Sequence, residues 1–366
     1  MGILRDQMRD QRGVVLILVV IVLGILFAFA ALALDVGNVM VVKNELQNIS
    51  DGAALAAARH LGGIYEGMSY ANQQIYDASN DAVTIRSVAQ QVGASNTAAG
   101  ILNVAIHLSD VEIGRWDSTT HPPVFTPTYS QPDAVRVRAR KDGLANGPLV
   151  TFLARIFGMN TVDVSATATA ALTGQSTAGP GGLPVPVGIS KYWFDNQPAF
   201  NFCNQPIRFY PTNDPSSCAG WHVYDRYSNM NDRRLRDTIS DIENHRYESP
   251  YTQAYGTQFE FGGGTMSIHT FAAMRSLFLA NLNYDANPSI AGNDAWLTGV
   301  PVYDSSDCSN PHGAITIVGF ATIVITNVQD SPVHQIDGYV ICNDIEPSRG
   351  SGGNYGTKGS IPGLVQ

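Results

Sequence analysis

The sequence contains few charged residues, and Lys and Arg are fewer than Asp and Glu. Of its 366 residues only 14% are charged, and 22 Lys and Arg against 31 Asp and Glu leave a net charge of −9. Binding to nucleic-acid phosphates needs concentrated Lys and Arg, so we expect no nucleic-acid partner. The one basic cluster is bracketed by Asp232 and Asp237, which is typical of a solvated helix face: Arg233, Arg234 and Arg236.

Signatures of catalysis and metal binding are also missing. The chain has no Gly-x-Ser-x-Gly elbow, no Walker loop, no Gly-x-Gly-x-x-Gly and no His-Glu-x-x-His. Four isolated aspartates could offer oxygens to a cation, but they lack the spacing of a calcium loop and are more typical of turns: Asp195, Asp214, Asp225 and Asp304. We therefore expect no enzyme, no catalytic residue, no cofactor and no metal site.

Cysteine is rare, and all four cysteines lie in the second half of the chain: Cys203, Cys218, Cys308 and Cys342. A zinc site would need a C-x-x-C pair or histidines at ligand spacing to a cysteine, and neither is present. Two disulfides in an oxidising compartment are the expected alternative. Three connectivities are possible, and proximity in the sequence favours Cys203 with Cys218 and Cys308 with Cys342.

The most informative feature is a long apolar run, residues 13–34, which contains no charge and no proline. At about 1.5 Å per residue a helix over this run would measure roughly 33 Å, enough to cross a bilayer. Arg5, Arg9 and Arg12 precede it, whereas the first cation beyond it is Lys43. The positive-inside rule therefore predicts a cytoplasmic N-terminus over residues 1–12 and a periplasmic remainder. A cleaved signal peptide is the alternative, because small-x-small patterns occur near Ala30.

An amphipathic segment, residues 35–63, follows the apolar run and predicts a helical stalk. Apolar residues repeat every seven positions and form one a/d-like seam: Val39, Val42, Leu46, Ile49, Ala53 and Ala56. Gly62 and Gly63 are expected to end the helix. The seam could pack on this chain's own globular part or on a neighbouring helix, and its small residues favour close approach in either case.

Beyond the stalk the patterns predict an α+β fold with two parts. Residues 64–173 form a small α+β module, with helices at 82–92 and from Pro148 through Phe157, strands at 111–116, 135–140 and 162–170, and an exposed loop at 117–132. Residues 174–186 are a Gly/Pro-rich linker, residues 187–346 a larger β-rich α+β domain, and residues 347–366 a Gly/Ser-rich tail.

Within the larger domain, short strands are expected at 207–210, 221–224 and 259–261, and helices at about 231–244 and 270–282. The β-branched run at 314–328 predicts a central strand paired with 336–342. The Gly/Ser-rich tail cannot bury a core alone, so a flexible end is expected. Docking of the tail through Tyr355, Ile361 and Leu364 is the alternative.

Two groups of residues resemble a known family. Leu32-Ala33-Leu34-Asp35-Val36-Gly37 and Leu46-Gln47-Asn48-Ile49-Ser50-Asp51-Gly52-Ala53-Ala54-Leu55-Ala56, placed after the apolar span, are similar to the N-terminal region of the TadE/TadG-like Flp (tight adherence) pilus-assembly family. Residues 133–140, 148–158 and 162–168 resemble the region that follows in TadG-like proteins, so the resemblance covers about the first 173 residues. The glutamate that usually lies five residues after a prepilin cleavage site is missing after Gly13, which argues against prepilin-type cleavage and a major-pilin role.

The resemblance implies a membrane-anchored minor pilin or assembly component that acts in pilus biogenesis and surface adhesion. Its partners would be inner-membrane lipid, other pilin-like subunits and the Tad assembly machinery, with a homo-oligomer as a further candidate. A second hypothesis is a membrane-tethered periplasmic ligand-binding or hydrolytic protein that uses the stalk only as a spacer. It predicts a concave polar pocket with converging carboxylates or histidines in the second domain.

Overall fold

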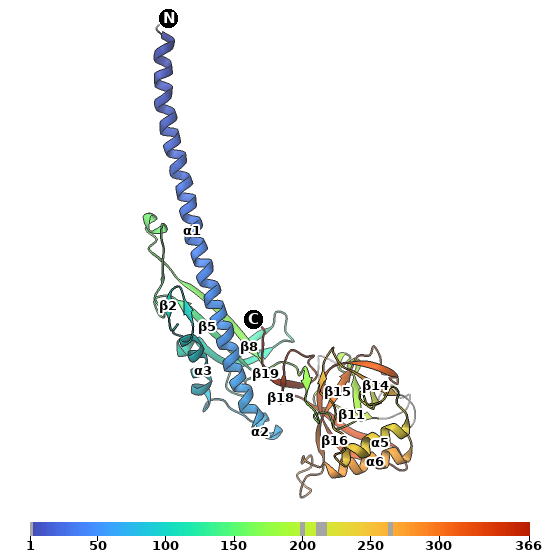
Figure 1. The fold of residues 1–366 in the computed structure, drawn as a ribbon. Coiled ribbons are helices and arrows are strands. Elements are labelled where there is room, and N and C mark those ends of the chain that lie inside the picture. Colours follow the sequence, from blue (N-terminus) through green and yellow to red (C-terminus); the bar gives the residue numbers. More distant parts are fainter. Residues whose placement is uncertain (1–2, 198–201, 210–217, 263–265) are drawn as a thin grey trace.

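The computed structural model describes residues 3–197, 202–209, 218–262 and 266–366. Its longest element is one continuous helix, α1 (Ile3–Glu66), which projects far out of the globular part at its N-terminal end (Figure 1). The helices expected over the span and the stalk are therefore confirmed, and they form one continuous helix. The expected stop at Gly62 and Gly63 is wrong, because α1 continues to Glu66.

The C-terminal half of α1 is part of the first domain. This domain has a five-stranded antiparallel sheet in the order β20-β8-β5-β3-β4. Its strands are β3 (Val111–Asp117), β4 (Val124–Pro127), β5 (Ala134–Lys141), β8 (Val164–Ala171) and β20 (Gly363–Leu364). Helix α3 (Ala82–Ala94) and the short α2 (Tyr70–Gln74) complete the α1 side, together with a small hairpin of β1 (Thr97–Ala98) and β2 (Ile101–Leu102) and the 3-10 turn η1 (Leu108–Asp110).

Small side chains on both surfaces bring α1 close to the sheet. Ala53, Ala54, Ala57 and Ala58 of the helix are fully buried in one apolar cluster with the alternate alanines of β8, Ala166, Ala168 and Ala170. Residues two apart on a strand point to the same face, so the alternation of β8 presents a face without bulky side chains. Alanine on alanine allows close backbone approach, which explains why this stretch of the helix is so rich in alanine.

The segment between β5 and β8 differs from the expectation. Instead of a helix from Pro148 through Phe157, the structure has a hairpin: β6 (Leu149–Val150) pairs with β7 (Thr161–Val162), and the 3-10 turn η2 (Ala154–Phe157) lies between them. Gly158 follows η2 with a φ of 86°, a left-handed conformation that ends the turn. The loop expected at 117–132 is also partly wrong, because it contains strand β4.

The second domain is built on seven strands whose pairings close a circuit, β16-β14-β12-β10-β15-β16, with β17 and β11 added beside β16. The bounds are β10 (Val187–Ser190), β11 (Pro206–Phe209), β12 (Ala219–His222), β14 (Gln258–Gly262), β15 (Trp296–Tyr303), β16 (Gly313–Gln329) and β17 (Gln335–Ile341). The expected central strand and its partner are confirmed by the long pairing of β16 with β17.

Strand β16 is buried on both faces. Val318 and Ala321 join the larger core, into which α5 (Asp232–Glu243) and α6 (Ile268–Ala280) also pack, whereas Ile317 and Phe320 join an aromatic core with Phe259. A strand covered on both sides reads as a continuous apolar run. The short helix α4 (Lys191–Asp195) follows β10.

The C-terminal tail is not free, so the expectation of a flexible end is wrong. β18 (Asp344–Arg349) pairs in parallel with β19 (Thr357–Ile361), β20 pairs with β8 of the first domain, and Tyr355 is buried. The second domain is therefore inserted between β8 and the strands that return to the first domain. Its connection is also packed: β9 (Thr177–Ala178) pairs with β13 (Thr252–Gln253), and Leu183 and Val185 are buried.

The disulfides join residues that are distant in the sequence. Cys203 bonds Cys342 and Cys218 bonds Cys308, so the favoured pairing of near neighbours is wrong. Strand pairing gives the reason for the first bond: β11 runs antiparallel to β17, which places Cys203, just before β11, beside Cys342, just after β17. The Cα atoms of these two cysteines are 5.4 Å apart.

Candidate functional site

The N-terminal half of α1 presents an apolar surface that the rest of the chain does not cover. From Val15 to Leu34 every side chain is exposed except Ala31. The helix is long and apolar enough to cross a membrane, and among the described residues it alone meets that criterion. An exposed apolar surface of this length is unfavourable in water, so lipid or other apolar helices must cover it.

Asp35, the first charged residue after the span, marks the point where the globular part meets α1. Its carboxylate accepts hydrogen bonds from the backbone N–H groups of Phe152 (2.6 Å), Leu153 (3.0 Å) and Ala154 (2.6 Å) at the start of η2. These bonds, the one from Phe152 foremost, lower the pKa of Asp35 below its ordinary value, although burial opposes them. Asp35 thus holds the β6–β7 hairpin against the end of the span.

The predicted seam of α1 packs on this chain's own sheet. Four of its six residues, Val42, Leu46, Ile49 and Ala53, are buried in the first domain's core, and Val39 also packs against that core. The sixth, Ala56, is half-buried. Of the two open alternatives for the seam, the structure therefore shows the intramolecular one, and the seam offers no free surface to a neighbouring helix.

A buried serine adds a polar link between helix and sheet. The Ser50 hydroxyl lies 2.9 Å from the carbonyl oxygen of Leu46 in its own helix and 3.1 Å from that of Ala166 in β8, and it accepts the N–H of Ala139 in β5 at 3.1 Å. A buried hydroxyl is favourable only where such partners exist. Ser50 therefore fixes the position of α1 on strands β5 and β8.

The C-terminal end of α1 is held by strand β19. Arg59 forms an ion pair with Glu66 at 2.8 Å, and the hydroxyl of Ser360 donates to the same carboxylate. The hydrogen bond from Arg59 is the main reason that the pKa of Glu66 is lowered. Gly62 approaches this strand so closely that a Cβ there would lie 2.0 Å from the carbonyl oxygen of Ser360.

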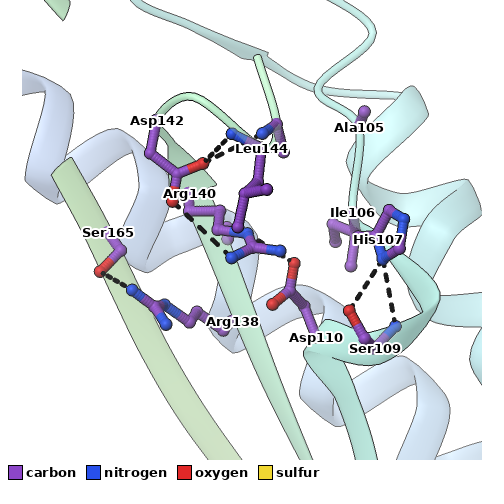
Figure 2. Close-up of polar contacts among 12 residues, drawn as sticks. Ala105, Ile106, His107, Ser109, Asp110, Arg138, Arg140, Asp142, Leu144 and Ser165 are labelled. Carbon is purple, nitrogen blue, oxygen red and sulfur yellow. Dashed lines mark hydrogen bonds and ion pairs between the residues drawn. The ribbon is translucent and has the colours of Figure 1, made fainter. Parts of the chain in front are cut away.

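A second polar cluster lies where β5 ends (Figure 2). The guanidinium of Arg140 is 2.8 Å from the Asp110 carboxylate and 3.7 Å from that of Asp142, and Arg140 is buried. Asp142 also accepts the N–H groups of Leu144 and Ala145. Each carboxylate faces a cation or backbone donors, so the cluster is built to fix the η1 turn and the turn after β5.

A hydrolytic or ligand-binding site is poorly supported by the titratable groups. Across the described ranges no three His, Cys, Asp or Glu side chains gather as they would around a metal ion. His222 is fully buried among Tyr224, Phe259 and Phe261, and burial lowers its pKa to about 3. A neutral histidine in an aromatic core has no access to a substrate.

A cleft lies at the junction of the domains and is lined by residues of both. It has a volume of about 560 Å³ and is lined by residues that include Trp116, Asp133, Phe202 and Lys358. Lys358 and Asp133 are 2.6 Å apart, and Asp133 also accepts the N–H of Trp116. Lys358 and Asp133 therefore neutralise each other, and Asp117 is the one other charged residue among the described lining residues.

Sequence reasoning found the span, the seam and the four cysteines but missed the partners of Asp35. The available signal was the position of Asp35 as the first charge after the span, because a carboxylate at that place needs donors once it is buried. The apolar residues of the β6–β7 hairpin were visible too. Their spacing alone predicts a helix.

Comparison with protein families yields two matches, both in the first half of the chain. Residues 13–60 match the family model described as Flp pilus-assembly TadE/G-like, and residues 71–170 match the model described as Tad-like Flp pilus-assembly. Together they span α1 from the start of the apolar run and most of the first domain. No curated protein and no solved structure matches the chain.

Proposed function

The chain belongs to the TadE/TadG-like Flp pilus-assembly family, and we propose that it acts as a membrane-anchored minor pilin or assembly component. The family and the apolar N-terminal helix together make it a pilus-assembly-related membrane protein with one span. The narrower role rests on how α1 divides into an exposed and a buried half.

The observation that carries the proposal is this division of α1. Its first half exposes apolar side chains from Val15 onward, and its second half is a core element of the first domain. Because α1 is continuous, Ser50 ties it to β5 and β8 and Gly62 packs it closely against β19, we expect the span and the domain to move as one rigid unit. A flexible tether would not need these close contacts between α1 and the domain. A subunit in which helix packing in the membrane positions an outer domain does need them.

The proposed topology places residues 1–12 in the cytoplasm and both domains outside the inner membrane. Arg5, Arg9 and Arg12 precede the span, and cations close to a span favour the cytoplasmic side. Two disulfides in the second domain agree with an oxidising compartment. In this arrangement the second domain lies farthest from the membrane and is the part available for contacts with the filament or with a surface.

Deletion and complementation test the proposal. A deletion strain should lose sheared surface pili and adhesion, and the full chain should restore both. A chain in which Val19, Leu23 and Leu26 of the span are replaced by alanine should still insert, since alanine is compatible with a membrane helix, but should restore piliation poorly because helix packing is lost. A deletion strain with normal pili and adhesion would contradict the proposal.

A further inference from the structure

We propose that the β6–β7 hairpin, residues 149–162, is a second membrane contact whose tip enters the lipid headgroup and upper acyl region beside α1. The inference requires only that α1 crosses a bilayer, and it does not depend on which protein partners the chain meets. Three observations carry it: the apolar surface of the tip, its position along α1 and its attachment to the helix.

The tip of the hairpin exposes large apolar side chains. Phe152 and Phe157 are each 70% exposed and Ile156 is 74% exposed, and Met159 and Val150 are exposed as well. These residues occupy only ten positions of one surface hairpin. Large exposed apolar side chains gathered on one short hairpin mark a surface that is covered in the working protein.

The hairpin lies at the level where α1 leaves the membrane. It extends along α1 toward the N-terminus beyond the rest of the globular part (Figure 1). Asp35 binds the first three N–H groups of its turn, and Ala31, one helical turn deeper and on the same face of α1, is the one buried residue between Val15 and Leu34. Four residues correspond to about 6 Å along the axis, within the roughly 5–10 Å to which interfacial segments enter a bilayer.

The chemistry of the tip fits lipid better than a protein groove. Two phenylalanines, Ile156 and Met159 are accompanied by an exposed Arg155, whose cation can remain among the headgroup phosphates. The hairpin is attached to α1 at Asp35, directly after the exposed apolar residues of the span, so one bilayer can cover both. The capping of η2 by Asp35 satisfies backbone donors that would otherwise lose their water on insertion.

Site-directed fluorescence on the full chain tests this contact. Both described disulfides are intact and no free cysteine is present among the described residues, so an engineered cysteine can be labelled selectively with an environment-sensitive probe. Phe157→Cys and Ile156→Cys place the probe on the tip. Ile75→Cys is the matched control, because Ile75 is 80% exposed but follows α2, beyond the opposite end of α1.

The labelled chains are reconstituted in vesicles of phosphatidylethanolamine and phosphatidylglycerol that carry nitroxide groups on the acyl chains near the headgroup. Both tip probes should lose about half or more of their emission to these lipids and resist aqueous iodide, whereas the Ile75 probe should show the opposite. Tip probes that iodide quenches as fully as the control would overturn the proposal. So would tip probes protected from iodide but not quenched by the lipids, because a protein contact would then cover the tip.

Discussion

Replacing Gly62 with alanine tests whether the end of α1 is locked against the returning C-terminal strand. The new Cβ would lie 2.0 Å from the carbonyl oxygen of Ser360, and the obstacle is backbone that cannot rotate away. To reach ordinary contact the helix and β19 must separate by about 1.4 Å. The neighbouring Gly63 supplies a matched control, since nothing lies within 4 Å of a Cβ built there.

Both substitutions change helix propensity by the same amount, but only Gly62→Ala also creates a steric clash. Glycine to alanine inside a helix gains about 0.8–1 kcal/mol of stability from helix propensity. At Gly62 an overpacking cost of about 1–3 kcal/mol opposes that gain. The difference in unfolding free energy between the two variants is therefore the cost of the clash itself, and it should lie toward the upper end because a backbone atom has to move.

Pulse proteolysis of the full-length chain in detergent across a urea series measures this difference. Gly63→Ala should move the unfolding midpoint to higher urea than the wild type, and Gly62→Ala should move it to lower urea. Equal stabilisation by the two substitutions would refute the close packing of α1 against β19, and with it the return of the C-terminus to the first domain.

Three further predictions follow from the buried polar groups and the disulfides. Ser50→Ala should lower the unfolding free energy by about 1–3 kcal/mol because it removes a buried hydroxyl that bonds both strands, whereas Asn48→Ala on the exposed side should change it by less than about 0.5 kcal/mol; urea titration of both variants checks this. Asp35→Asn should lower the melting temperature at pH 7. The pKa of Asp35 is lower in the folded chain than the value of about 3.9 expected in the unfolded chain. The difference in melting temperature between wild type and Asp35→Asn should therefore be largest at neutral pH. It should disappear as the pH falls from about 3.9 to below the folded pKa, where Asp35 is protonated. Peptide mapping without reductant should recover the linked pairs Cys203–Cys342 and Cys218–Cys308, and linkage of Cys203 to Cys218 would contradict the antiparallel pairing of β11 with β17.

Much of the fold follows from local patterns in the sequence. The apolar span and the β-branched run of β16 are each one uninterrupted, mainly apolar stretch, the seam has one clear heptad period, and the structure places α1 and β16 accordingly. In such segments the burial of apolar surface alone decides which secondary structure forms. The local pattern of apolar residues is therefore sufficient to predict these elements.

The remaining features depend on contacts between distant residues. The β6–β7 hairpin has apolar residues at helical spacing, but the carboxylate of Asp35, more than a hundred positions earlier, binds the N–H groups at the start of η2. The left-handed Gly158 then ends the turn after Phe157, and the chain returns as β7. The tail looks flexible by composition. Its glycines, however, permit backbone contacts closer than a side chain allows, as where Gly352 meets the backbone of Gln175. Disulfide pairing likewise follows strand order and not proximity in the sequence.

The most direct test of the account is site-specific photocrosslinking along α1 in cells that assemble pili. Probes at Leu26 and Val41 lie on exposed parts of the helix, and a probe at Leu46 lies in the buried seam. We predict that Leu26 and Val41 capture pilin-like subunits, while Leu46 forms crosslinks only within its own chain. Capture of a pilin-like subunit from Leu46 would contradict the assignment of the seam to this protein's own core.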